Sequence, residues 1–121
     1  MPKFGFDEAA WDAGVEEGRR ALIVCAKQRQ MIPYSDFVQQ IRAIGFEGPH
    51  DPRLPHFLQE ISVGESRAGR GMLTALVVHK RGDMQPGPGF FELAGELGHD
   101  TSDIEKFWIQ EVKKVFAAWN E

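Results

Sequence analysis

The sequence predicts a single α+β domain that is mainly helical and carries a small antiparallel hairpin. Several segments repeat apolar residues every three or four positions, as amphipathic helices do. One continuous apolar run, 72–78, is instead typical of a strand that is covered on both faces. The chain has 121 residues and no internal repeat or long linker, which fits one domain over residues 1–121.

The first expected element is a helix over residues 7–28. Asp7 is a good N-cap for it. The apolar positions that follow recur at roughly helical spacing: Trp11, Val15 and Leu22. Gly18 lies on the same face, although glycine costs a helix about 1 kcal/mol relative to alanine. We therefore expect Gly18 to admit a close neighbour.

A short second helix is expected after Pro33, which biases the residue before it toward extended backbone. Ser35 can cap this helix, and Gly45 is a natural C-terminal stop. The apolar face between these two residues is expected to comprise Phe37 or Val38, Ile41 and Ile44.

A third helix is expected to begin at Asp51, which suits the N-cap position. Pro52 then takes the first helical position, where its missing N–H costs no hydrogen bond. One face is apolar and is predicted to be buried: Leu54, Phe57, Leu58 and Ile61. Polar side chains point elsewhere: Arg53, His56, Gln59 and Glu60.

The strand that the sequence predicts most clearly is Met72–His79. A glycine-broken connection precedes it, and a short strand over 61–63 is considered as its neighbour. Lys80, Arg81, Gly82 and Asp83 follow it and are expected to form a turn.

Residues 85–89, Gln-Pro-Gly-Pro-Gly, are the most unusual stretch of the chain. A helical apolar stripe follows, with Gly98 as its stop: Phe90, Leu93, Ala94 and Leu97. The two prolines remove N–H groups that a phosphate-binding loop would use, so we interpret the stretch as a rigid corner that packs Phe90 and Phe91 into the core. The alternative is a loop that lines a ligand site or meets a partner, formed by Pro86, Gly87, Pro88, Gly89, Phe90 and Phe91.

The last predicted helix is the clearest. Ser102 and Glu105 have the spacing of a capping box at its start. Apolar and aromatic side chains follow: Ile104, Phe107, Trp108, Val112, Val115, Phe116 and Trp119. We expect this seam to pack in the core. It is broad for one helix, however, and tryptophan is favoured at interface centres, so a homodimer is the alternative.

Three helices followed by a hairpin is the element order of a winged helix-turn-helix. By analogy with that order, the leading hypothesis is a non-enzymatic recognition module that binds nucleic acid or a protein partner. Basic side chains at the hairpin ends would contact phosphate, and polar side chains of the third helix would face the groove. The nucleic-acid site expected on this basis comprises Arg53, His56, Gln59, Arg67, Arg70, Lys80 and Arg81.

The rival hypotheses are a small metal-assisted hydrolase or nuclease and a small-molecule-binding domain that uses the Pro-Gly corner. Glu60, Glu65 and His79 bracket the predicted strand, and carboxylates near a strand end can hold Mg²⁺. Their spacing matches no metal-site signature. No HExxH pattern accompanies the other ligands considered, which are His50, Asp51 and His56. We therefore predict no catalytic residue, no cofactor and no metal site.

Composition and charge limit the class of protein. One cysteine, Cys25, excludes an internal disulfide and fits a reducing compartment. The N-terminus lacks the apolar segment of a signal peptide, and no apolar run is long enough to span a bilayer, so we expect a cytoplasmic protein without a membrane partner. The net charge is −4, yet residues 27–81 carry +3 and residues 82–121 carry −5. The basic middle segment is a candidate for contact with an anion.

The blocks GRGMLTALVVHK and PGPGFFELAGELG resemble the blocks GRxMLTALVV and PGxGFFELA of short, uncharacterised bacterial proteins. The resemblance covers about residues 54–119 and implies no activity and no catalytic residue. PYSDFVQQI is similar, more faintly, to a segment in the DNA-binding half of alkyltransferase-like proteins, where it opens a short helix after a long one. The Pro-Cys-His-Arg motif of that family is absent, so the likeness does not imply alkyl transfer.

Overall fold

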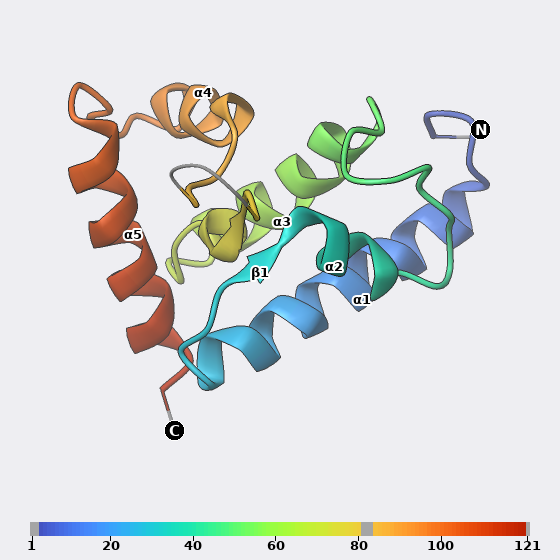
Figure 1. The fold of residues 1–121 in the computed structure, drawn as a ribbon, viewed down its shortest axis with the longest axis horizontal. Coiled ribbons are helices and arrows are strands. Elements are labelled where there is room, and N and C mark those ends of the chain that lie inside the picture. Colours follow the sequence, from blue (N-terminus) through green and yellow to red (C-terminus); the bar gives the residue numbers. More distant parts are fainter. Residues whose placement is uncertain (1–2, 81–83, 121) are drawn as a thin grey trace.

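The computed structural model describes residues 3–80 and 84–120 (Figure 1). In these residues the chain forms, in order, α1 (Glu8–Lys27), β1 (Ile32–Pro33), α2 (Tyr34–Gln39), α3 (Leu54–Arg67), the 3₁₀-helix η1 (Leu73–Leu76), β2 (Val77–Val78), α4 (Pro88–Glu96) and α5 (Ile104–Ala118). The mainly helical α+β class predicted from the sequence is confirmed.

The centre of the molecule is the apolar segment 72–78, which is buried throughout. The helices α1, α3 and α5 all contact η1 within this segment. Figure 1 shows α4 and α5 on one side of it and α1 with α2 on the other, with α3 behind. The prediction that this run is covered on both faces is therefore confirmed.

The predicted antiparallel hairpin is wrong for the described residues. Where the sequence predicts a strand over Met72–His79, η1 takes the first part and β2 only two residues. β2 pairs in parallel with β1, with Ile32 opposite Val77 and Pro33 opposite Val78. In a parallel ladder the residues before Val77 would pair with residues before Ile32, but there the N–H groups of residues 28–30 bond to carbonyls of α1. Without a partner strand at that point, residues 73–76 form hydrogen bonds within their own 3₁₀ turn instead.

Side chains from α5 complete the hydrogen bonding of this buried segment. Glu111 accepts the N–H of Met72 at 2.8 Å, and the indole Nε1 of Trp108 donates to the carbonyl of Ala75 at 2.8 Å. Buried backbone groups must be paired somewhere, and here two long side chains of α5 replace the missing strands. Most of the α5 seam therefore packs in the core, as predicted, with Phe107, Val112 and Val115 buried. Ile104, at the start of the seam, is exposed instead.

Two predicted boundaries on the α2 and α3 side are wrong. The short second helix ends at Gln39 rather than at Gly45. The Glu17 carboxylate of α1 accepts the N–H groups of Arg42 and Ala43, so these groups bond to α1 instead of to a helical turn. The short strand predicted over 61–63 is instead part of α3, which continues to Arg67.

Aspartate side chains cap α1 and α5, whereas no described side chain caps α2, α3 or α4. The predicted caps of α2 and α3 are wrong, because Pro33 takes the N-cap position expected for Ser35 and Arg53 takes the one expected for Asp51. Asp7 caps α1 as expected, accepting the N–H of Ala10. Asp103, not Ser102, caps α5, because the Ser102 hydroxyl donates to Asp100. α3 begins at Leu54, so the predicted first helical residue, Pro52, lies before the helix.

Two glycine predictions are confirmed. Gly18 on α1 is buried, and a Cβ at that position would lie 3.0–3.1 Å from side-chain atoms of Phe57, Ile61 and Phe37. Gly18 therefore lets α1 approach α2 and α3 closely, as the sequence indicates. Gly98 follows α4 with φ +92°, the left-handed conformation that stops a helix.

Candidate functional site

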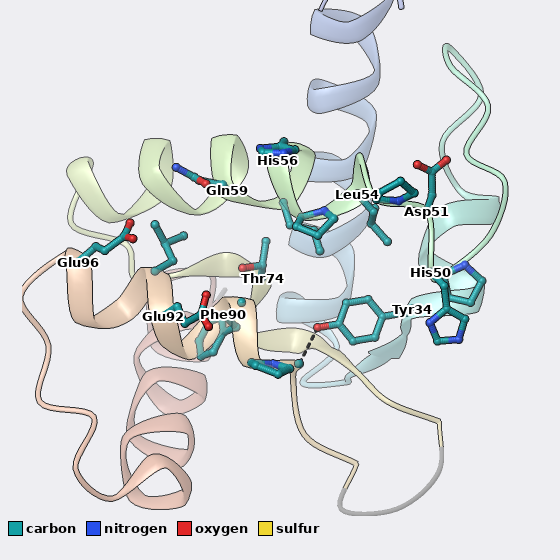
Figure 2. Close-up of a pocket in the computed structure, with 18 residues that line it drawn as sticks. Tyr34, His50, Asp51, Leu54, His56, Gln59, Thr74, Phe90, Glu92 and Glu96 are labelled. Atoms are coloured by element: carbon teal, nitrogen blue, oxygen red, sulfur yellow. Dashed lines mark hydrogen bonds between the residues drawn. The ribbon is translucent and has the colours of Figure 1, made fainter. Parts of the chain in front are cut away.

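A cleft of about 370 Å³ lies between α3 and the Pro-Gly corner at the start of α4 (Figure 2). Four segments that are distant in sequence line it: Tyr34 at the start of α2, the stretch 49–59 that leads into α3, Thr74 of η1, and residues 87–96. Its volume falls at the lower end of the range typical for small-molecule sites.

The floor of the cleft is apolar. Leu54 from α3 and Phe90 and Leu93 from α4 are buried side chains whose edges reach the cleft. Thr74 of η1 is also buried there and shares a short hydrogen bond with the Ser62 hydroxyl of α3. Because these residues belong to the core, the floor is held in place by the same packing that stabilises the fold.

Tyr34 links the corner to the rest of the fold. Its hydroxyl accepts the N–H of Gly87 at 2.8 Å, the bond drawn in Figure 2. Its ring lies 5.1 Å from that of His79, measured between centroids. Burial raises the pKa of Tyr34, and the Gly87 N–H only partly offsets this, so the phenol stays neutral. The hydroxyl proton is left to donate to a group in the cleft.

The α3 wall carries exposed polar side chains. His56 and Gln59 both line the cleft and are exposed. The His56 ring also stacks on Phe4, with centroids 4.4 Å apart and planes 14° apart. The stacking restricts the His56 ring, whereas Gln59 projects from the helix across the cleft from Glu96 (Figure 2).

The charge of the cleft is negative. Its lining contains no lysine or arginine. Three carboxylates line it, of which Asp51 is already held by two hydrogen bonds from the Arg53 guanidinium, at 2.9 and 2.8 Å. Glu92 and Glu96 of α4 are exposed, and neither forms an ion pair with any described residue.

The structure divides the predicted nucleic-acid residues among separate places. His56 and Gln59 line the cleft. Arg53 bonds Asp51 and lies 4.2 Å over the Phe6 ring, so its charge is neutralised. Arg67 ends α3, a helix of 14 residues, and therefore lies about 20 Å from Arg53 along the axis.

The other predicted phosphate contacts lie elsewhere. Arg70 bonds Glu65 at 2.6 Å and lies over the Trp119 ring. Lys80 follows β2 and is exposed, while Arg81, with the rest of the predicted turn over 81–83, lies outside the described residues. Arg53 and Arg70 therefore pair with carboxylates near opposite ends of α3.

The hydrolase arrangement considered from the sequence does not come together. Glu60 accepts the Trp11 indole N–H at 3.0 Å and does not line the cleft. Glu65 is buried between two arginines, and His79 packs against Tyr34. In the part of the chain that the structure describes, no three His, Cys, Asp or Glu side chains are placed to hold a metal ion.

The Pro-Gly corner packs into the core and also lines the cleft. Phe90 is buried in the core and packs edge-on against Phe91, with centroids 5.2 Å apart. Four residues of the corner nevertheless line the cleft: Gly87, Pro88, Gly89 and Phe90. Pro86 is buried and Phe91 is half-buried, and both lie outside the lining. The same rigid corner therefore packs against the core and forms one wall of the cleft.

Four polar residues of the cleft lining belong to no site considered from the sequence: Tyr34, Thr74, Glu92 and Glu96. Tyr34 carries no signal in the sequence, because its partner Gly87 is 53 residues away. Glu92 and Glu96 do carry one. They stand four residues apart in a helix without a lysine or arginine, a spacing that places like charges side by side.

Comparisons with protein-family models, curated proteins and solved structures found no match. Among the helices of the described residues, none has both the length and the apolar character needed to cross a bilayer.

Proposed function

We propose that this protein is a non-enzymatic recognition module that binds a small organic ligand in the α3–α4 cleft. The observation that carries the proposal is the convergence of four distant segments on one cleft with an apolar floor and a few polar groups at its rim. This combination is typical of ligand sites.

The chemistry of the lining favours binding over catalysis. A nucleophile needs a base within hydrogen-bonding reach, and a third group to orient that base. In the cleft, Thr74 bonds Ser62, and the Tyr34 hydroxyl takes a backbone N–H. Asp51 is committed to Arg53 and to backbone N–H groups. These groups fix the walls, and none of them is activated by a base.

A winged-helix module that binds nucleic acid has less support. Such a module needs unpaired cations on one surface to replace counterions along the phosphate backbone. Arg53 and Arg70 are paired with carboxylates, and the cleft that contains His56 and Gln59 carries negative charge.

The test is a titration of the ¹⁵N-labelled protein with a set of small aromatic and aliphatic fragments, followed by NMR. Binding in the cleft is expected to shift the amide signals of Gly87, Gly89 and Gln59. Two variants place a large side chain on opposite walls, Gly89→Trp and Gln59→Trp, and each should abolish these shifts.

Gly64→Trp is the matched control. A Cβ at Gly64 or at Gly89 meets no atom within 4 Å, so both positions accept a side chain, but only Gly89 lines the cleft. If fragments shift no cleft amide, or shift them equally in Gly89→Trp, the proposal is wrong. Fluorescence anisotropy with labelled duplex DNA and single-stranded RNA, at two salt concentrations, tests the nucleic-acid alternative with Lys80→Ala as the variant.

A further inference from the structure

We infer that the ligand of the α3–α4 cleft is an organic cation, an ammonium group carried on an apolar body. The inference rests on the proposed function, because it names the chemistry of the molecule that the cleft takes. Three features of the lining support it: the sign of its charge, its aromatic rings, and the way the start of α4 uses its own N–H groups.

The charge is the first feature. Glu92 and Glu96 supply two negative charges at the rim, and no lysine or arginine of the lining offsets them. Asp51 adds no charge of its own, because Arg53 bonds both of its oxygens. A cation entering the cleft thus meets two carboxylates that have no other partner among the described residues.

The spacing of the two glutamates strengthens this argument. Residues four apart on a helix face the same side, and like charges there destabilise the helix slightly. Glu92 lies beside Phe90 over the floor, and Glu96 points toward Gln59 on the opposite wall (Figure 2). A bound cation between them would relieve their repulsion and would be drawn toward both oxygen pairs.

Aromatic rings provide the second feature. Tyr34 and Phe90 line the cleft. The face of an aromatic ring attracts an ammonium group, most strongly when the group is partly removed from water. The apolar floor formed by Leu54 and Leu93 suits a hydrocarbon body attached to that group.

The third feature argues against an anion. The N-terminus of a helix attracts anions only through N–H groups that are free. At the start of α4 the Gly87 N–H donates to Tyr34, Pro88 has no N–H, and the Phe90 N–H donates to the Gly87 carbonyl at 3.1 Å. Only Gly89 is left, so the start of α4 is poorly equipped to bind a phosphate or a carboxylate.

Three probes that share a phenyl ring on a short alkyl chain but differ in charge test the inference: 3-phenylpropylamine, 3-phenylpropan-1-ol and 3-phenylpropionate. Each is titrated into the ¹⁵N-labelled protein, and the dissociation constant is taken from the amide shifts of Gly87, Gly89 and Gln59. The amine is expected to bind at least about fivefold more tightly than the alcohol, because each exposed carboxylate contributes about 0.5 kcal/mol. The propionate is expected to bind most weakly.

The variant Glu92→Gln/Glu96→Gln should remove the advantage of the amine and leave the affinity for the alcohol unchanged. Glu8→Gln/Glu105→Gln is the matched control, since it removes the same charge from exposed glutamates at the starts of α1 and α5. Nα-acetyl-lysine methylamide, titrated in parallel, distinguishes a lysine side chain of a peptide from a free amine as the source of the ammonium group.

The outcomes separate the inference from the proposed function. If the alcohol or the propionate shifts the cleft amides as strongly as the amine does, the cleft is a ligand site but the cationic class is wrong. If the amine keeps its advantage in the double variant, the charges of Glu92 and Glu96 are not the cause, and the inference is overturned. If no probe shifts the cleft amides, both the inference and the proposed function fail.

Discussion

Two regions of the molecule hold glutamates in opposite ways. Glu65 of α3 is almost fully buried, with 3% of its side chain exposed, and bonds Arg19 of α1 and Arg70 at 2.6 Å each. Both guanidinium groups also lie over the Trp119 ring, at 5.7 and 5.3 Å from its centroid. This Glu65 cluster joins α1, α3 and the end of α5 through one carboxylate.

The cleft glutamates, Glu92 and Glu96, lie in water beside an open cleft and bond none of the described cations. A buried charge is tolerated only when partners replace its water, so the partners of Glu65 show that it serves the fold. A solvated charge needs no protein partner and is available to a ligand.

The same comparison bears on the basic middle of the chain. Residues 27–81 carry a net charge of +3, which indicates an anion-binding surface when the sequence is considered alone. In the structure, Arg70 is bonded to Glu65 and Arg53 to Asp51. Both pairs lie within this segment, so they leave its net charge at +3 but occupy two of the predicted phosphate contacts.

The largest expected effect is that of Glu65→Gln. The change leaves two guanidinium groups without their shared carboxylate, and breaking a buried pair costs about 3 kcal/mol at the lower end of its usual range. The lower end applies because Arg19 and Arg70 are each about a third exposed. Denaturant unfolding measures the change. Glu105→Gln, on the exposed start of α5, is the control and should alter the free energy of unfolding by less than about 0.5 kcal/mol.

The next effect is a loss of stability in acid. The hydrogen bond from Arg53 is the main reason why the pKa of Asp51 lies well below its ordinary value. Burial raises the pKa of Glu65, but hydrogen bonds from Arg70 and Arg19 outweigh burial and lower it. A carboxyl group with a lowered pKa stabilises the fold fully above its unfolded pKa, and this stabilisation is lost as pH falls through its folded pKa.

We therefore expect the free energy of unfolding to be flat near neutral pH and to fall progressively below about pH 5. Asp51→Asn should make this fall shallower, because one of the two groups no longer titrates. A fall of equal steepness in the variant and the wild type would show that Asp51 does not contribute.

A third contrast concerns two helical glycines, one with neighbouring side chains close to its Cβ position and one with open space there. Gly18→Leu forces a side chain against Phe57, Ile61 and Phe37, whose atoms already lie 3.0–3.1 Å from a Cβ at that position. Overpacking of this kind costs about 1–3 kcal/mol. Gly64→Leu on the open face of α3 should instead stabilise the protein by up to about 1 kcal/mol, since leucine is the better helix former. Thermal unfolding of the two variants measures both changes: the midpoint temperature should fall for Gly18→Leu and rise for Gly64→Leu.

These contrasts also indicate which features a sequence can predict. Helix α1, the close approach at Gly18, the helix after the Pro-Gly corner and its stop at Gly98 all follow from local spacing and backbone preference, and all are confirmed. The apolar run 72–78 was predicted to be buried but not to be a 3₁₀-helix. Its conformation depends on a distant segment, residues 28–30, whose N–H groups bond to α1 and which therefore offer no partner strand.

The candidate site could be predicted only in part, for the same reason. From the sequence, Phe90 and the glycines of the corner are candidates for a ligand loop. His56 and Gln59 are separate candidates for contacts with nucleic acid. Only the tertiary fold brings α3 against α4 and gives both groups one cleft. Tyr34 reaches the corner through a hydrogen bond from Gly87, a residue that no local pattern connects to it.

The smallest expected effect is that of Glu92→Gln/Glu96→Gln on stability. Both side chains are exposed and have no partner among the described residues, so their loss should leave the free energy of unfolding within about 0.5 kcal/mol of the wild type. A slight gain is expected, because the variant removes a like-charge pair four residues apart on α4. The result is most informative beside Glu65→Gln, which makes the same chemical change in the Glu65 cluster.

A large loss of stability in the double variant would mean that the cleft glutamates hold the fold together, and the contrast between the two regions would disappear. A small effect, combined with the large effect of Glu65→Gln, separates charges that stabilise the fold from charges that are free to act on a ligand. Proteins keep repulsive surface pairs at some cost in stability, and functional sites are where such costs are expected. The stability of the double variant and its affinity for 3-phenylpropylamine should therefore change in opposite directions.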